Sequence, residues 1–218
     1  MTDVSPSVTE SVPVGAVDRA TAKAALLDAI ARVPKPTGLP ALSADIEASI
    51  ADLEAYNPTP VTTAAAELLT GNWLTLYTSS DELLRLGSTL PGFKVGNMYQ
   101  YIQADKGFVC NVAEINGLPY LGGLAVVRAS FKAVSERRVK VTFHQAMIAS
   151  QAITNYQVDS FIHLLECKPD QIPALKITFP ENREQKGWLD ITYLDETLRV
   201  GRGNEGSVFV LSKVPLSA

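Results

Sequence analysis

Residues 188–211 read W-L-D-I-T-Y-L-D-E-T-L-R-V-G-R-G-N-E-G-S-V-F-V-L, and this stretch decides the fold. Two runs rich in β-branched and aromatic residues, 188–194 and 207–211, flank the shorter run 198–202. The two links between the runs, 195–197 and 203–206, consist mostly of turn-forming residues. Such links between such runs are typical of β-hairpins. The stretch therefore predicts a three-stranded antiparallel meander at the end of the chain.

Upstream of the meander, apolar and polar residues alternate with the period of two that half-buried strands require. Val127, Ala129 and Phe131, for example, fall on one face of a strand, and the residues between them are polar. The strands expected from this pattern are 73–78, 95–103, 108–115, 123–135, 139–148 and 175–179. With the meander they make about nine mostly antiparallel strands. Such a set tends to close into a barrel because closure removes exposed edges.

Before residue 71 the apolar residues recur with a helical period. Helices are expected over 16–33, over 43–56 with Ser43 as N-cap, and over 60–70 with Pro60 in the first turn. A short helix over 81–86 is also expected, and residues 149–173 fit either a strand or a helix. The predicted regions are a disordered 1–15, a helical 16–70 that packs on the barrel, and a barrel over 71–218.

Composition and charge limit the classes of protein to which the chain can belong. With 218 residues, 46% hydrophobic and 19% charged, the chain can bury a full core. Its net charge is −4, with four basic and nine acidic side chains in 1–71 and fifteen basic and fourteen acidic side chains in 72–218. Neither part has the positive field that nucleic-acid binding or strong attraction to anionic lipid needs. The acidic N-terminus lacks secretory-signal features, which favours a cytoplasmic bacterial protein or a mature form.

The meander also resembles the C-terminal motif of the plastid lipid-associated protein family, also called fibrillins. The matching positions are Trp188-Leu189-Asp190, Tyr193-Leu194-Asp195, Leu198-Arg199, Arg202-Gly203, Gly206 and Phe209-Val210-Leu211. The segment from Gly71 to Ser80 resembles the first strand of the same family, with Trp73 followed by Leu-x-Tyr-Thr-Ser. Its Gly-x-Trp start is also similar to the lipocalin entry motif.

The resemblance implies a lipocalin-like barrel of about eight or nine strands with helices before it. It implies peripheral association with thylakoids and with lipid globules such as plastoglobules, and a link to isoprenoid and quinone storage, membrane protection and stress response. A cyanobacterial member on the cytoplasmic side of the thylakoid membrane is expected, or a protein of the plastid stroma or thylakoid if the chain is a mature plant form.

Three functions are compatible with these features. The first is a non-enzymatic carrier or structural protein for hydrophobic small molecules such as carotenoids, prenylquinones or lipids. The alternative is an interaction scaffold with a filled barrel, whose N-terminal helices dock an enzyme of isoprenoid or quinone metabolism. The third is an enzyme that acts on a lipid. Apolar loops at 90–93 and 118–123 could contact a lipid surface or fold back as lids.

A barrel of about eight strands either fills its lumen with side chains or leaves room for a ligand. Small or flexible residues at expected lumen positions leave volume for a ligand. The ligand-binding candidates are Trp73, Tyr77, Ala125, Val127, Ala129, Val141, Phe143, Met147 and Arg199.

The arginines of the meander have two interpretations. In one, Arg199 or Arg202 lies at the barrel mouth and meets an anionic or polar ligand end. In the other, one of them stacks on Trp73 and closes the barrel, while Asp190 neutralises the other. The residues expected to close the barrel are Trp188, Asp190, Asp195 and Arg202.

The sequence contains none of the usual catalytic motifs, and no cofactor or metal is predicted. Gly201-x-Gly203-x-x-Gly206 matches a dinucleotide fingerprint in letters, but a strand rather than a helix is expected after it, so it is interpreted as a hairpin turn. His163 and Cys167 would offer only two metal ligands, which is too few for a zinc site. Cys110 and Cys167 are expected to be small buried thiols rather than a disulfide.

Overall fold

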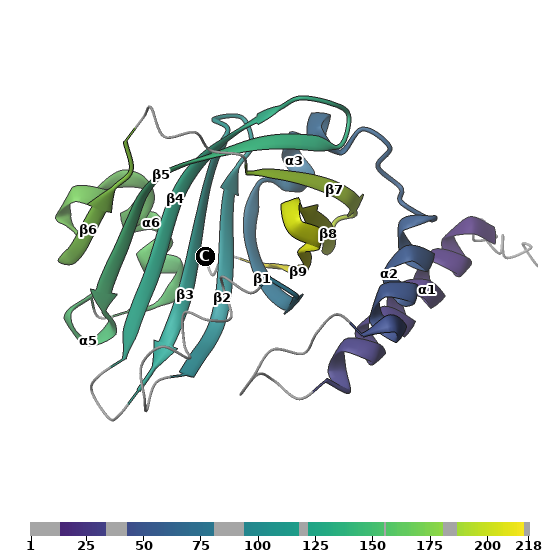
Figure 1. Ribbon diagram of the computed structural model, residues 1–218, viewed down its shortest axis with the longest axis horizontal. Coiled ribbons are helices and arrows are strands. Elements are labelled where there is room, and N and C mark those ends of the chain that lie inside the picture. Colours follow the sequence, from purple (N-terminus) through teal and green to yellow (C-terminus); the bar gives the residue numbers. More distant parts are fainter. Residues whose placement is uncertain are drawn as a thin grey trace, which may run out of the picture.

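The computed structural model describes residues 14–33, 43–80, 94–117, 122–154, 156–180 and 187–215. It is a strongly curved antiparallel sheet with a pair of helices against one side (Figure 1). No helix within these ranges combines the length and the apolar character needed to cross a bilayer. The expected disorder of 1–15, the expected helix 81–86 and the apolar loops at 90–93 and 118–123 lie wholly or largely outside the described residues.

Nine strands are described, and all of the expected strands are among them. They are β1 Gly71–Thr78, β2 Lys94–Gln103, β3 Phe108–Asn116, β4 Gly123–Ala133, β5 Arg138–Ser150, β6 Ala174–Thr178, β7 Trp188–Leu194, β8 Leu198–Gly203 and β9 Val208–Val214. Their order in the sheet is β4-β3-β2-β1-β9-β8-β7-β5-β6, and β4 also pairs with β5. Eight strands therefore form a closed ring with β6 as an extra strand, which confirms the predicted antiparallel barrel.

Strand β5 changes its partner along its length. Its residues 138–140 pair with β7 and close the ring, whereas its residues 145–149 pair with β6. The ring is thus hydrogen-bonded at one end, and at the other end β6 extends the wall formed by β2 to β5 (Figure 1).

The expected helix pair is present as α1 Val14–Ala31 and α2 Ala44–Glu54, and Ser43 caps α2 by accepting from the backbone N–H of Ile46. The predicted single helix over 60–70 is wrong, because η1 Thr62–Ala64 and α3 Ala66–Leu69 replace it. The barrel draws this segment out of helical geometry: the Thr62 hydroxyl donates to the carbonyl of Ile191 at 3.0 Å.

The region that the sequence left undecided is helical. It contains α5 Gln151–Thr154, α6 Val158–Cys167 and η2 Pro169–Gln171. The Gly-x-Gly-x-x-Gly segment spans the end of β8 and the short turn η3 Asn204–Gly206 before β9, so the hairpin interpretation is confirmed. Gly206 has a φ of 75°, a backbone conformation that favours glycine.

Three apolar clusters organise the packing. One lies inside the barrel and joins residues of β1, β2, β3, β4, β5, β7 and β9, including Trp73, Ile102, Ala129, Val139, Ile191 and Leu211. A second lies outside it, between the helix pair and the strands β1 and β7 to β9. A third lies outside it, between α6 and the strands β3 to β5. The barrel therefore has helices on two parts of its outer surface and an inner face of its own.

Candidate functional site

One continuous row of side chains crosses the inner face of the sheet. Residues directly opposite each other in antiparallel strands point to the same face. The register joins, from β1 to β6, Trp73, Gln100, Asn111, Val127, Ala146 and Ile177. Trp73 is fully buried in the inner cluster, whereas Ile177 is 53% exposed. The inner face therefore runs from a sealed end of the barrel to an open one.

The sealed end is closed by α3. Trp73 Nε1 donates to the carbonyl of Leu69 at 2.9 Å, and Lys213 Nζ donates to the carbonyl of Leu68 at 2.8 Å. The Lys213 ammonium also lies 5.2 Å from the centre of the Trp73 ring. Because the last carbonyls of a helix have no partner within it, these contacts satisfy the helix end and fix α3 as the plug of the barrel.

The open end exposes a group of large apolar side chains. Phe143, Ile148, Leu175 and Ile177 are 37%, 55%, 67% and 53% exposed. Ile148 pairs with Leu175, and Phe143 pairs with Ala129 of the inner cluster, so all four lie on the inner face. Contiguous exposed apolar surface commonly marks a binding site.

The structure places most of the predicted ligand-binding residues together. Register and packing assign seven of the nine to the inner face: Trp73, Ala125, Val127, Ala129, Val141, Phe143 and Arg199. The two others, Tyr77 and Met147, are on the outer side, and the expectation for them is wrong. Tyr77 packs in the cluster of the helix pair, and Met147 packs in the cluster of α6.

Two β-bulges explain both errors. The pairing of β1 with β9 shifts between Thr75 and Tyr77, and the pairing of β4 with β5 shifts so that Ala129 faces Phe143 while Arg128 faces Gln145. A bulge adds one residue to a strand and reverses which face the following side chains occupy. Alternation counted from Trp73 or from Val141 therefore fails beyond the bulge.

Arg199 is the most deeply buried of the charged groups described on the inner face. It is 2% exposed, and its guanidinium carbon lies 4.9 Å from the centre of the Trp73 ring. Its Nη2 donates to the side-chain carbonyl of Gln100, while its Nε has no partner. Burial lowers the pKa of Arg199 to about 9, so the guanidinium remains charged at neutral pH.

The seam between β5 and β7 carries a different arginine from the expected one. Arg138 donates to both carboxylate oxygens of Asp190, at 2.6 and 2.7 Å, and its guanidinium lies 3.9 Å from the centre of the Trp188 ring. The expected partner of Asp190 was a meander arginine, so this assignment is wrong. Trp188 and Asp190 do lie at the closing seam, because Arg138 is the cross-strand partner of Asp190 there.

Arg202 joins the barrel to the helices instead. Its Nε and Nη2 donate to the two carboxylate oxygens of Glu54 at 2.8 and 3.1 Å, and its Nη1 donates to Glu47 at 2.7 Å. The hydrogen bonds from Arg202 to Glu54 are the largest cause of the raised pKa of Arg202. Sequence alternation could not reveal this contact, since the two carboxylates are about 150 residues away along the chain.

Substitution Arg202→Lys should lower the free energy of unfolding by about 1 kcal/mol, because lysine cannot form the forked pair with Glu54. The loss is modest because the pair is partly exposed and water screens its charges. Thermal denaturation should show a midpoint about 2–4 °C lower for a chain of this size. Glu47→Gln is the matched control, which keeps the fork and should change the midpoint less. A midpoint unchanged by Arg202→Lys would contradict the structural role.

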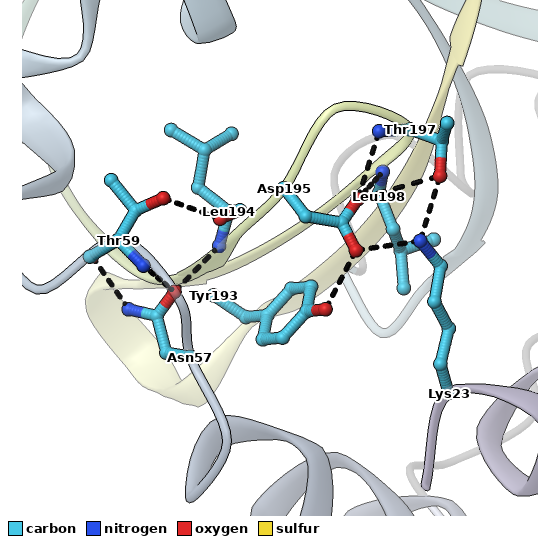
Figure 2. A network of polar contacts seen from close by, with 8 residues as sticks. All are labelled: Lys23, Asn57, Thr59, Tyr193, Leu194, Asp195, Thr197 and Leu198. Atoms are coloured by element: carbon cyan, nitrogen blue, oxygen red, sulfur yellow. Dashed lines mark hydrogen bonds and ion pairs between the residues drawn. The ribbon is translucent and has the colours of Figure 1, made fainter. Parts of the chain in front are cut away.

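Asp195 is the centre of a buried polar network at the β7–β8 turn (Figure 2). It accepts from Lys23 and from the Tyr193 hydroxyl, both at 2.6 Å, and from the backbone N–H groups of Thr197 and Leu198. Burial alone would raise the pKa of Asp195, but these hydrogen bonds outweigh it and the pKa is lowered. The network ties α1 to the turn, so Asp195 joins helix to barrel rather than lying at the β5–β7 seam.

The Asn57 side chain continues this connection (Figure 2). Its Oδ1 accepts from the backbone N–H groups of Thr59 and Leu194, and the Thr59 hydroxyl donates to the carbonyl of Leu194. The link between α2 and η1 is thereby fixed to the end of β7.

Among the inner-face residues that sequence reasoning missed are Gln100, Asn111, Ala146 and Ile148. Leu175 and Ile177 alternate with polar residues, a pattern typical of a strand with one buried face, but both are exposed, because β6 lies beyond the closing seam. Gln100 and Asn111 carried a signal that could have found them. They are polar residues at corresponding positions of two neighbouring strands, and their amides are hydrogen-bonded at 2.7 Å.

The cysteines differ from each other. Cys110 is buried, and burial raises the pKa of its thiol to about 12. Cys167 is exposed near the end of α6, contrary to the expectation, with its sulfur 3.8 Å from Nδ1 of His163. Within the described ranges, no three His, Cys, Asp or Glu side chains gather as a metal site would need.

A second concave surface lies between α1 and α2. Its pocket has a volume of about 460 Å³ and is lined by both helices, including Asp18, Ser49 and Asp52, and by Tyr56 just after α2. The carboxylates of Asp18 and Asp52 do not suit an apolar ligand, so the inner face of the barrel is the better candidate.

The comparison with known proteins agrees with the resemblance found in the sequence motifs. The profile of the PAP_fibrillin family matches residues 20–212. The chain is 33% identical to plastoglobulin-1, chloroplastic, of Pisum sativum, with 78% of this chain and 54% of that protein covered. It is 33% identical to probable plastid-lipid-associated protein 2, chloroplastic, of Arabidopsis thaliana, with 78% and 63% covered.

A third relative is the chromoplast-specific carotenoid-associated protein of Cucumis sativus, at 32% identity with 78% of this chain and 60% of that protein covered. The chain thus spans only a little over half of the length of these relatives. No solved structure matches. The family profile covers both the helix pair and the barrel, and on this ground the chain belongs to the plastid lipid-associated protein and fibrillin family.

Proposed function

We propose that this protein is a non-enzymatic carrier or storage protein for hydrophobic small molecules such as carotenoids, prenylquinones or lipids. The observation that carries the proposal is the apolar inner face, which is sealed by α3 at one end and exposes Phe143, Ile148, Leu175 and Ile177 at the other. A ligand would enter at the exposed end and lie along Val127 and the small residues beside it.

The driving force is burial of apolar surface. Each 100 Å² of apolar surface removed from water contributes about 2.5 kcal/mol. The inner face of β4 and β5 suits this role because Ala125, Ala129 and Ala146 fill little volume, whereas the exposed Phe143 and Ile148 offer contact area.

The relatives support the class of ligand and the place of action. Their names describe plastid-lipid-associated and carotenoid-associated proteins of chloroplasts and chromoplasts. By extension, this chain acts in a plastid or at the cytoplasmic side of a cyanobacterial thylakoid, at the surface of a membrane or lipid globule. The apolar residues at the open end would face that surface, since the net charge of −4 offers little attraction to anionic lipid.

The alternative, a scaffold that docks an enzyme through its N-terminal helices, would need an unpartnered apolar helix surface. The apolar stripe of the helix pair is not available for docking, because Leu26, Ile46, Ile50 and Leu53 are each at most 2% exposed against the barrel. The carrier is therefore preferred over the scaffold.

The test uses two bulky substitutions on the same strand. Ala146→Trp adds a large side chain to the inner face of β5, whereas His144→Trp adds the same side chain at an exposed position whose imidazole contacts Ser130 on the outer side. Tagged wild type and both variants are purified from the native cell, and their organic extracts are analysed by mass spectrometry.

A terpenoid or lipid in molar proportion to protein is expected with wild type and His144→Trp, and at least a tenfold smaller amount with Ala146→Trp. A wild-type extract that contains no such molecule, or an Ala146→Trp extract that equals wild type, would refute the carrier function.

A further inference from the structure

Arg199 differs from Arg138 and Arg202 in that no carboxylate among the described residues pairs with it. Arg138 forms a forked pair with Asp190, and Arg202 forms one with Glu54. Arg199 is more deeply buried than either, at 2% exposure, yet none of the described residues forms an ion pair with it. Within the described part of the chain, Arg199 donates a hydrogen bond to the Gln100 amide and lies over the Trp73 ring.

A buried, uncompensated charge is strongly destabilising, because no partner replaces the water that the guanidinium loses. A second cation adds to this cost, because the Lys213 ammonium lies 5.2 Å from the centre of the same Trp73 ring. Burial is the largest cause of the lowered pKa of Lys213, and the charge of Arg199 lowers it further. Two cations therefore lie at the sealed end of the inner face with no described carboxylate between them. An anionic group from outside the chain would remove the imbalance.

Polar side chains continue from Arg199 toward the open end for a short distance only. Gln100 accepts from Arg199 through Oε1 and donates to Asn111 Oδ1 through Nε2, and the half-buried Asn111 Nδ2 donates to none of the described residues. Beyond Asn111 the row becomes apolar, with Val127, Ala146 and the exposed Ile177. The row is thus polar at one end and apolar at the other.

We propose that the barrel takes single-chain amphiphiles with an anionic oxygen head, a carboxylate or a phosphate, and that Arg199 binds this head. Asn111 provides a second donor, and Gln100 is a positioning residue that orients both. The tail lies along the apolar part of the row, which extends from β4 to β6 over about 10 Å at the usual strand spacing. This proposal rests on the carrier function and names the ligand class within it.

The test compares three ligands with the same hydrocarbon chain: oleate, oleoyl lysophosphatidate, and the uncharged oleyl alcohol. Binding is measured with the full chain by displacement of a fluorescent fatty-chain probe. At least one of the two anions should bind wild type roughly ten- to hundredfold more tightly than oleyl alcohol, since a hydrogen bond to a charged group contributes that much in affinity. Which anion binds more tightly distinguishes a carboxylate from a phosphate source.

Arg199→Met should reduce the affinity for the anions to that for oleyl alcohol, and should leave the oleyl alcohol affinity within about twofold. Its thermal midpoint should equal or exceed that of wild type, because it removes an unpaired charge. Arg202→Gln, on the same strand but facing the helices, is the matched control and should keep the preference for anions. Should Arg199→Met fold poorly, Arg199→Lys should keep part of that preference, because it keeps the charge.

The outcomes separate this proposal from the carrier function. Equal affinity of wild type for oleyl alcohol and for both anions would overturn the anionic-head proposal and leave the carrier function standing. An anion preference that persists in Arg199→Met would also overturn it. Binding of none of the three ligands would overturn the proposal and count against the carrier function as well.

Discussion

Substitution Trp73→Ala should lower the free energy of unfolding by about 4 kcal/mol, the usual cost of truncating a fully buried tryptophan. Trp73 is 0% exposed, and its ring is the centre around which the sealed end packs. Truncation would remove the hydrogen bond to the Leu69 carbonyl and leave both Arg199 and Lys213 without the ring they contact. Urea denaturation followed by circular dichroism measures the change.

The other tryptophan supplies the control. Trp188 is only partly buried and contacts Arg138 on the outside of the seam, so Trp188→Ala should cost about 1 kcal/mol. If the two substitutions cost the same, the idea that the Trp73 ring organises the sealed end is wrong.

Substitution Asp195→Ala should lower the free energy of unfolding by about 3 kcal/mol at neutral pH. Three kinds of contact are lost at once: the ion pair with Lys23, the hydrogen bond from the buried Tyr193 hydroxyl, and the two backbone N–H bonds that shape the turn. Buried donors left without an acceptor cost about 1–3 kcal/mol each when they cannot reach water. Chemical denaturation at neutral pH measures the loss.

The pH dependence follows from the lowered pKa of Asp195. A carboxylate whose pKa is lowered by folding adds stability above its ordinary pKa of about 4, and this stability is lost as the pH falls through the lowered folded pKa. The stability difference between wild type and Asp195→Asn should therefore be largest near neutral pH and should shrink on acidification below about pH 4.

Lys23→Met is the comparison for this network. Lys23 is 22% exposed at its side chain, and its removal leaves the other donors to Asp195 in place, so it should cost about 1 kcal/mol. An Asp195→Ala protein as stable as wild type would show that the network adds nothing to stability. A difference between wild type and Asp195→Asn that does not depend on pH would show that the charge of Asp195 adds nothing.

Local patterns were sufficient for most of the fold. The closing meander, the strands from β1 to β6 and the N-cap Ser43 were predicted because turn chemistry, alternation and capping depend on residues close together in the sequence. The prediction of a single helix over 60–70 failed because the Thr62 hydroxyl donates a hydrogen bond to Ile191 of β7, a contact that no local pattern contains. The family assignment also followed from local motifs, since the segments around Trp73 and Trp188 each match a motif of the family.

The candidate site was predicted only in part. Val127, Ala129 and Phe143 were correctly placed on one face, whereas Tyr77 and Met147 were not, because each lies after a bulge and a bulge is visible only in the pairing of two strands. The ion-pair partners of Asp190 and Arg202 also could not be predicted from the sequence. Asp190 takes Arg138 and Arg202 takes Glu54, and both choices depend on which strands and helices become neighbours.

By itself, the sequence determined that the chain forms strands with one apolar face, a helix pair with an apolar stripe, and a terminal meander of this family. Only the tertiary structure decided that β5 divides its length between β7 and β6, which leaves Ile148 and Ile177 exposed at an open end. It also decided that Arg199 is buried with no carboxylate partner among the described residues. The physical reason is that the face a side chain occupies and the type of a turn depend on neighbours in the chain. The closure of the barrel and the pairing of charges depend on segments that meet only after folding.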